Sequence, residues 1–109
     1  MSLYTRIKAA QDSKDIDGYL ECLHEDFVFV RHQSGAEVSK TDWIPTLTAM
    51  MQSDALVFSD QRCLYENDEI MIEHSFMTFP DGTSEAVMVV NHLKDGKIIR
   101  VETGATPIK

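Results

Sequence analysis

Residues 66–97 read ENDEIMIEHSFMTFPDGTSEAVMVVNHLKDGK, and three turn signals divide this stretch at nearly equal intervals. They are Asn67-Asp68, Asp81-Gly82 and Asp95-Gly96. Such pairs tolerate positive φ and close tight hairpins. The runs beside them are rich in Val, Ile, Phe and Met, and equal spacing gives strands of similar length. We therefore predict an antiparallel meander of four strands, over about 55–66, 69–79, 83–94 and 97–105.

The residues before the meander favour helices, with one strand among them. Leu3, Ile7 and Ala10 share a helical face, which predicts a first helix over 3–13 with Ser2 as its N-cap. Asp15 caps a second, short helix, and Ser39 opens a third. Between the second and third helices, 26–31 is rich in Phe and Val and predicts a strand. The predicted fold class is α+β, a cone of three helices packed on a curved, mainly antiparallel sheet.

Composition indicates one domain, residues 1–109, with 43% hydrophobic residues and a net charge of −8. That charge argues against partners such as nucleic acid or an anionic membrane, because both require clustered Lys and Arg. No apolar run approaches the ~18 residues that span a bilayer, and Arg6 and Lys8 interrupt any signal peptide. Cys22 and Cys63 lack CxxC spacing and are expected to be reduced, which favours a cytoplasmic location.

Alternation of charge assigns faces to the predicted strands. Glu69 and Glu73 mark the wet face of the second meander strand, so its other face is predicted to point inward: Ile70, Ile72, His74, Phe76 and Thr78. In the last strand Ile99, Val101 and Thr103 are predicted to face inward. The third strand is apolar on both faces, which implies a second packing surface. We expect a homodimer that covers the outer face around Met88 and Val90.

The segments Asp15-Ile16-Asp17-Gly18-Tyr19-Leu20, Glu25-Asp26-Phe27-Val28-Phe29 and Leu93-Lys94-Asp95-Gly96-Lys97-Ile98 carry a resemblance to a known group. With the order of elements, they resemble the nuclear-transport-factor-like (SnoaL-like) superfamily. That superfamily includes ketosteroid isomerases, polyketide cyclases, scytalone dehydratase and limonene epoxide hydrolase. The resemblance implies a cone-shaped fold, and it says little about activity because the matching residues are turns and caps.

The catalytic residues of those relatives do not carry over. The position of the isomerase general base is Arg31, which is always protonated and cannot accept a proton from carbon. The position of the isomerase tyrosine is Ile7, and its partner acid falls near Asn91. The epoxide hydrolase set is not matched either, since Thr103 stands where a carboxylate is needed.

Three polar residues are candidates for chemistry or binding. His74, predicted inside an apolar cone, is the candidate catalytic acid or base, because the pKa of an imidazole moves readily through neutrality; the alternative is a structural histidine. Arg31 either holds a substrate carboxylate or pairs with an acid at the pocket rim. Asn91 fixes a ligand if it faces inward, but the strand register leaves open whether Asn91 or His92 does so.

Apolar side chains are expected to line or fill the cone: Phe27, Phe29, Trp43, Met50 and Phe76. The four histidines show no spacing typical of a metal site, so no metal and no cofactor are expected. The leading hypothesis is a pocket protein for a small, hydrophobic molecule, acting as a cofactor-independent isomerase, dehydratase or cyclase by His-mediated proton transfer. The alternatives are a non-catalytic ligand-binding module and a dimerisation scaffold of the same fold.

Overall fold

Three helices occupy the first half of the chain, and side-chain caps define where they begin. The computed structural model describes residues 2–32 and 34–108. Ser2, Asp15 and Ser39 each accept a hydrogen bond from a backbone N–H three residues further on, as the sequence predicted. The helices are α1 Leu3–Asp12, α2 Ile16–Leu20 and α3 Lys40–Gln52.

One mixed sheet of six strands forms the other layer, in the order β2-β1-β6-β5-β4-β3. β1 pairs with β6 in parallel, and the other neighbouring strands are antiparallel. The predicted meander from β3 to β6 is confirmed, whereas the three-residue β2 has too short a pattern to be noticed. The strands are β1 Leu23–Arg31, β2 Glu37–Ser39, β3 Val57–Glu66, β4 Ile70–Thr78, β5 Ser84–Lys94 and β6 Lys97–Ile108.

The three predicted hairpin turns form by two different means. Asp95 and Gly96 both adopt positive φ, at 55° and 75°, and Gly82 does so at 87°. Asn67 instead uses its side chain, whose oxygen accepts the N–H groups of Glu69 and Ile70 at 2.8 Å each.

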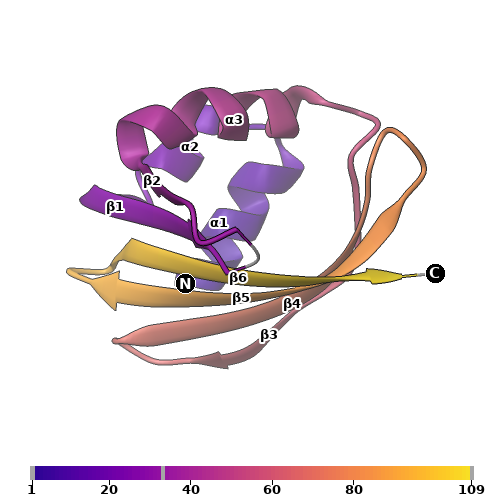
Figure 1. Ribbon diagram of the computed structural model, residues 1–109. Coiled ribbons are helices and arrows are strands. Elements are labelled where there is room, and N and C mark those ends of the chain that lie inside the picture. Colours follow the sequence, from indigo (N-terminus) through magenta and orange to yellow (C-terminus); the bar gives the residue numbers. More distant parts are fainter. Residues whose placement is uncertain (1, 33, 109) are drawn as a thin grey trace.

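The sheet curls around the helices, which all lie on its concave side (Figure 1). α3 runs over the concave side of the sheet, and the hairpin between β4 and β5 rises at one end of the cone (Figure 1). Irregular pairing helps β3 to bend, because its register with β4 shifts between Ser59 and Arg62, where Asp60 has φ 52°. The α+β cone is therefore confirmed. Within the described ranges, no helix is both long and apolar enough to cross a membrane.

The strand β4 presents to the helices the face opposite to the predicted one. Met71 is 0% exposed and lies in the core, and it pairs with Asn91, which is 2% exposed. Alternation then directs Glu73 inward as well. The prediction was wrong for Ile70, Ile72, His74, Phe76 and Thr78, which point outward. It assumed that a charged residue marks the wet face, but Glu69 lies in the turn before β4, and Glu73 faces the interior.

A second local correction concerns the start of β6. Its pairing with β5 shifts between His92 and Leu93, and this bulge turns Ile98 inward, where it is 2% exposed. Ile99, predicted to face inward, is therefore displaced from the inner face. Val101 and Thr103 face inward as predicted.

Candidate functional site

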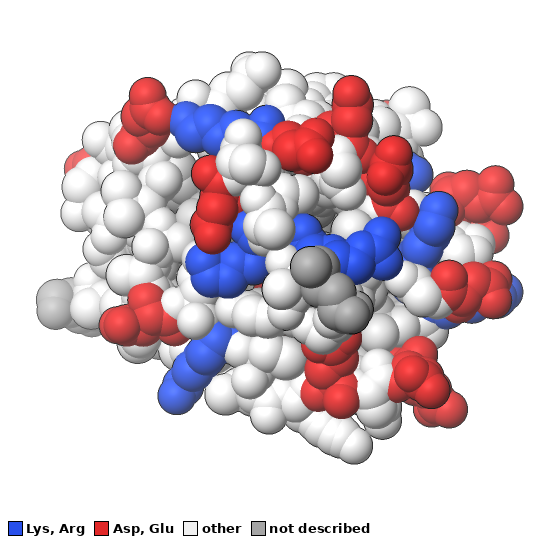
Figure 2. All heavy atoms as spheres, turned by 180° about the vertical axis from the view of Figure 1, so that it is seen from behind, with Lys and Arg blue, Asp and Glu red and all other residues white. Residues whose placement is uncertain are grey.

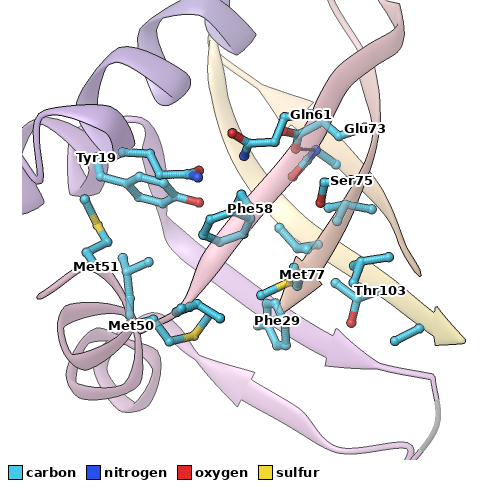
Figure 3. A pocket seen from close by; sticks show the side chains of 18 of the residues that line it. Tyr19, Phe29, Met50, Met51, Phe58, Gln61, Glu73, Ser75, Met77 and Thr103 are labelled. Atoms are coloured by element: carbon cyan, nitrogen blue, oxygen red, sulfur yellow. Dashed lines mark hydrogen bonds between the residues drawn. The ribbon is translucent and has the colours of Figure 1, made fainter. Parts of the chain in front are cut away.

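The cone encloses a cavity of about 750 Å³ between the helices and the concave face of the sheet. This volume lies within the range of small-molecule sites. Most of its wall is aliphatic and aromatic, with polar groups at a few places (Figure 3). The predicted wall residues Phe27, Phe29, Trp43 and Met50 all line it, so these side chains leave space rather than fill the cone.

Strand pairing orders the inner-face residues by depth. Residues that pair across antiparallel strands share a face, so each row of partners is a layer of the inner face, and most of these residues line the cavity. The rows run from the deeply buried end at Met71, here called the closed end, to the end beside the hairpin between β4 and β5, here called the open end. On β4, β5 and β6 they are Met71–Asn91–Val101, Glu73–Val89–Thr103, Ser75–Val87–Ala105 and Met77–Glu85–Pro107.

Glu73 places a carboxyl group in the second of these rows, deep in the cavity. The amide nitrogen of Asn91 donates to Glu73 Oε2 at 2.7 Å and to the carbonyl of Met71 at 3.1 Å. Burial raises the pKa of Glu73, the hydrogen bond from Asn91 opposes that rise, and the charge of Glu66 adds to it. In the described part of the chain, no cation forms an ion pair with Glu73. The Glu73 carboxylate is thus largely removed from water, and the hydrogen bond from Asn91 compensates only part of the cost of that burial.

Tyr19 brings a hydroxyl group from α2 to the same region. Figure 3 shows its hydroxyl directed into the cavity, on the side where Glu73 and Gln61 lie. Burial raises the pKa of Tyr19, and the negative charge of Glu73 raises it further. The phenol therefore stays protonated at neutral pH and is able to donate a hydrogen bond.

Phe29 and Trp43 form the aromatic part of the wall. Their ring centroids lie 4.0 Å apart with planes inclined by 10°, so the two rings are stacked. Trp43 is buried, while Phe29 is partly exposed. The pair offers a flat, rigid surface to a ligand ring, and contact of either residue with a ligand stays a prediction.

Arg31 lies further along the same strand as Phe29, where β1 ends. Its guanidinium carbon is 5.9 Å from the centroid of the Phe29 ring, and the residue is exposed. The alternative of a rim ion pair is not realised among residues 2–32 and 34–108, since no carboxylate there pairs with Arg31.

His74 does not have the position that its catalytic role requires. It pairs with Met88, which is 41% exposed on the outer face of the sheet. On the same face its ring packs edge-on against the ring of Phe76, with 5.2 Å between the ring centroids. Residue 74 borders the cavity, but alternation turns its ring away from it. The prediction that His74 and Phe76 face the cavity was therefore wrong, for the reason given for β4. Asn91 does face inward, and His92 faces outward.

The cone has counterparts in known proteins. A family model described as a SnoaL-like domain matches residues 4–101, which is most of the chain. The chain belongs to the SnoaL-like domain family. The wider superfamily includes isomerases and cyclases, which defines no specific reaction or substrate here. No curated protein matches the chain.

Solved structures share the fold of this SnoaL-like domain at low sequence identity. An NTF2-like protein of unknown function from Mesorhizobium loti has a TM-score of 0.81 at 16% identity, over 95% of this chain and 88% of that one. An NTF-2 like protein of unknown function from Burkholderia xenovorans LB400 has a TM-score of 0.80 at 13% identity, over 98% of this chain and 82% of that one. A putative ketosteroid isomerase from Kribbella flavida has a TM-score of 0.79 at 14% identity, over 98% of this chain and 77% of that one. These likenesses establish the fold alone.

Sequence reasoning missed Glu73 and Tyr19. In hindsight Glu73 had a signal, because it is the one acidic residue inside an otherwise uncharged strand, β4, and such a residue is often functional. Tyr19 carried no signal, since a tyrosine on a short amphipathic helix is typical of a core. No cluster of metal-ligating side chains occurs in the part of this SnoaL-like domain that the structure describes.

Proposed function

We propose that this SnoaL-like domain binds a small, largely apolar carbonyl compound in its cavity, and that Glu73 transfers a proton within it. The observation that carries the proposal is a carboxyl group held by Asn91 in the deep part of a mostly apolar cavity. Carboxyl groups in such sites commonly serve as acids or bases, since desolvation raises their pKa toward the working pH. The proposal keeps the reaction class predicted from sequence and replaces His74 with Glu73 as its actor.

Proton transfer at this site requires a base and a group that stabilises the developing charge. The Glu73 carboxylate accepts a proton from the carbon next to the carbonyl, and the electrons of the broken C–H bond move to the carbonyl oxygen. The Tyr19 hydroxyl donates a hydrogen bond to that oxygen. Protonated Glu73 then returns the proton to the same carbon, or to another carbon of the conjugated system. Return elsewhere is an isomerisation, and the same enolate leads to dehydration or cyclisation in suitable substrates.

Deuterium exchange into the methyl group of 2-acetylnaphthalene, followed by NMR in D₂O, tests this function. The native protein should accelerate exchange over buffer, and Glu73→Gln should reduce that acceleration by roughly 100-fold or more, because the amide accepts no proton from carbon. Binding of the same probe should change only a few-fold, since Gln preserves the shape of the cavity. Glu85→Gln is the matched control, because Glu85 is a second carboxylate in the wall, nearer the open end.

Exchange that survives Glu73→Gln would contradict the proposal. Binding of 2-acetylnaphthalene without any exchange by the native protein would favour the alternative, a non-catalytic ligand-binding module.

We also propose that a second copy of the chain covers the outer face of the sheet. Met88 is 41% exposed there, and it pairs across to His74, whose Nδ1 is buried without a hydrogen-bond partner among the described residues. Ile72 pairs with Val90 on the same face. An antiparallel sheet with this much apolar surface on its outer side is typical of an interface. This homodimer is the state in which we expect the cavity to work.

A further inference from the structure

Arg31 and Glu73 belong to one row that crosses the concave face of the sheet. Arg31 pairs with Thr103, Thr103 pairs with Val89, and Val89 pairs with Glu73. All four residues line the cavity. The strands that carry the two charged residues are three positions apart in the sheet, which is roughly 14 Å along the surface at about 4.8 Å a strand. Because the sheet is concave, the straight path across the cavity is shorter.

The middle of this row is apolar or already satisfied. Val89 has no polar side-chain atom, and the Thr103 hydroxyl donates to the carbonyl of Val30 at 3.2 Å. A ligand lying along the row therefore meets a charged group at each end and an uncharged floor between them.

Arg31 is directed toward this space and is not neutralised. Its guanidinium lies over the Phe29 ring, which is part of the cavity wall, rather than extending away from the protein. Of the other basic residues that border the cavity, Lys14 pairs with Asp54, and Arg62 pairs in register with outward-facing His74. Within the described ranges, Arg31 is thus the inner-face cation that no carboxylate neutralises.

The surrounding charge makes an unpaired cation at this position notable. The chain has a net charge of −8, and on the face seen in Figure 2 acidic side chains surround a smaller central group of basic ones. With 18 acidic residues available, a purely structural arginine would readily find a carboxylate partner. Arg31 instead retains a fork of N–H donors beside an aromatic ring, at the border of an apolar cavity.

We propose that the ligand is an organic carboxylate: Arg31 holds its anionic group, and its carbonyl end reaches Glu73. This inference rests on the proposed function and names the substrate class. One planar guanidinium matches a carboxylate through two parallel hydrogen bonds. A doubly charged phosphate group would require further donors, and the neighbouring inner-face residues Val89 and Ala105 supply none. The acid–base group and the anchoring group lie at opposite ends of the row, so the carboxylate and the reacting carbon are separated by a rigid, ring-sized spacer.

A pair of probes that differ in charge and scarcely in shape tests the carboxylate proposal. These are 6-acetyl-2-naphthoate and its primary amide, titrated into the native protein by isothermal titration calorimetry. The carboxylate should bind at least tenfold more tightly than the amide. Arg31→Gln should bring the ratio of the two affinities close to one, and Arg31→Lys should restore it only in part, because an ammonium lacks the fork. Arg62→Gln removes the same charge from β3, at the far edge of the sheet, and should leave the ratio unchanged.

Each outcome decides the proposal. Equal affinity of the two probes for the native protein, or a ratio that Arg31→Gln does not alter, overturns it, and so does failure of both probes to bind at millimolar concentration. Failure of the proposed function is distinguishable, because it leaves Arg31-dependent binding intact while the acetyl group of the bound carboxylate exchanges no deuterium. The ratio of the carboxylate affinity to the amide affinity is measured on the same folded variant. A general loss of stability would weaken both affinities and therefore would not change their ratio.

Discussion

The two faces of strands β4 and β5 depart in opposite ways from the usual pattern of a half-buried sheet, because the inner face includes buried polar groups and the outer face includes exposed apolar ones. The face toward the helices carries Glu73 and Asn91, whereas the face away from them carries Ile72, Phe76 and Met88. In an ordinary sheet the polar set is wet and the apolar set is covered by the rest of the chain. Here the inner set surrounds a cavity, and in the dimer that we propose a second copy of the chain covers the outer set. A binding protein places polar groups where a ligand meets them, even at a cost in stability.

The largest effect should be a difference in the free energy of unfolding between variants at two methionines on opposite faces of the sheet. Met71 is 0% exposed at the closed end of the cone, and Met88 is 41% exposed on the outer face. Met71→Ala should lower the free energy of unfolding by about 2–5 kcal/mol, because it leaves a hole in the core. Met88→Ala should change it by less than about 0.5 kcal/mol in the monomer. Urea unfolding at low protein concentration measures both, and similar losses would mean that the two faces are equally buried.

A smaller effect is expected on self-association. Met88→Lys places a cation in the proposed interface, and in a twofold dimer the same charge enters from each copy. We expect the dimer dissociation constant to rise at least tenfold, measured by sedimentation equilibrium. Ala9→Lys adds the same charge on an exposed position of α1 and should leave association unchanged. A native protein that is monomeric at micromolar concentration would refute the dimer.

The smallest effect is the dependence of the free energy of unfolding on the ionisation of Glu73. Its pKa is raised in the folded state from an ordinary value of 4.5, chiefly by burial. Between that value and the folded-state pKa the folded chain binds more protons than the unfolded chain, so stability falls as pH rises through this window. Glu73→Gln removes this loss of stability, because glutamine does not ionise. The variant should be more stable than the native protein by roughly 1 kcal/mol at neutral pH.

The same comparison at acid pH provides the control for Glu73. Near pH 4 the native carboxyl group is largely protonated in both states, so the stability difference between the native protein and Glu73→Gln should shrink there. Thermal unfolding followed by circular dichroism at the two pH values measures it. A variant less stable than the native protein at neutral pH would mean that the carboxylate is stabilising where it lies.

Architecture was predictable because it depends on local signals. Asp81-Gly82 and Asp95-Gly96 mark turns by their backbone requirements, and the caps Ser2, Asp15 and Ser39 mark helix starts. These residues act on their own neighbours, so their effect is visible in sequence. The short β2 was missed because three residues do not establish an alternation.

The site was less predictable because it depends on which face of a strand is covered. A strand alternates with period two, so an error of one residue exchanges the cavity residues for the outer ones, which is what happened with His74 and Glu73. Phe27 and Phe29 line the cavity, although the run of Phe and Val in β1 is apolar on both faces and does not by itself decide which of them face inward. Tyr19 faces the cavity through the packing of α2, which no pattern within five residues reveals.

The amide of Asn91 sends one hydrogen to a backbone carbonyl and the other to Glu73, so its plane has a single orientation. Exchange of that nitrogen for oxygen, as in an aspartate, would set two carboxyl groups side by side with no hydrogen between them until one took up a proton. The pair would then titrate in two coupled steps. One atom at the closed end of the cone thus decides whether Glu73 titrates alone or shares a proton with a second carboxyl group.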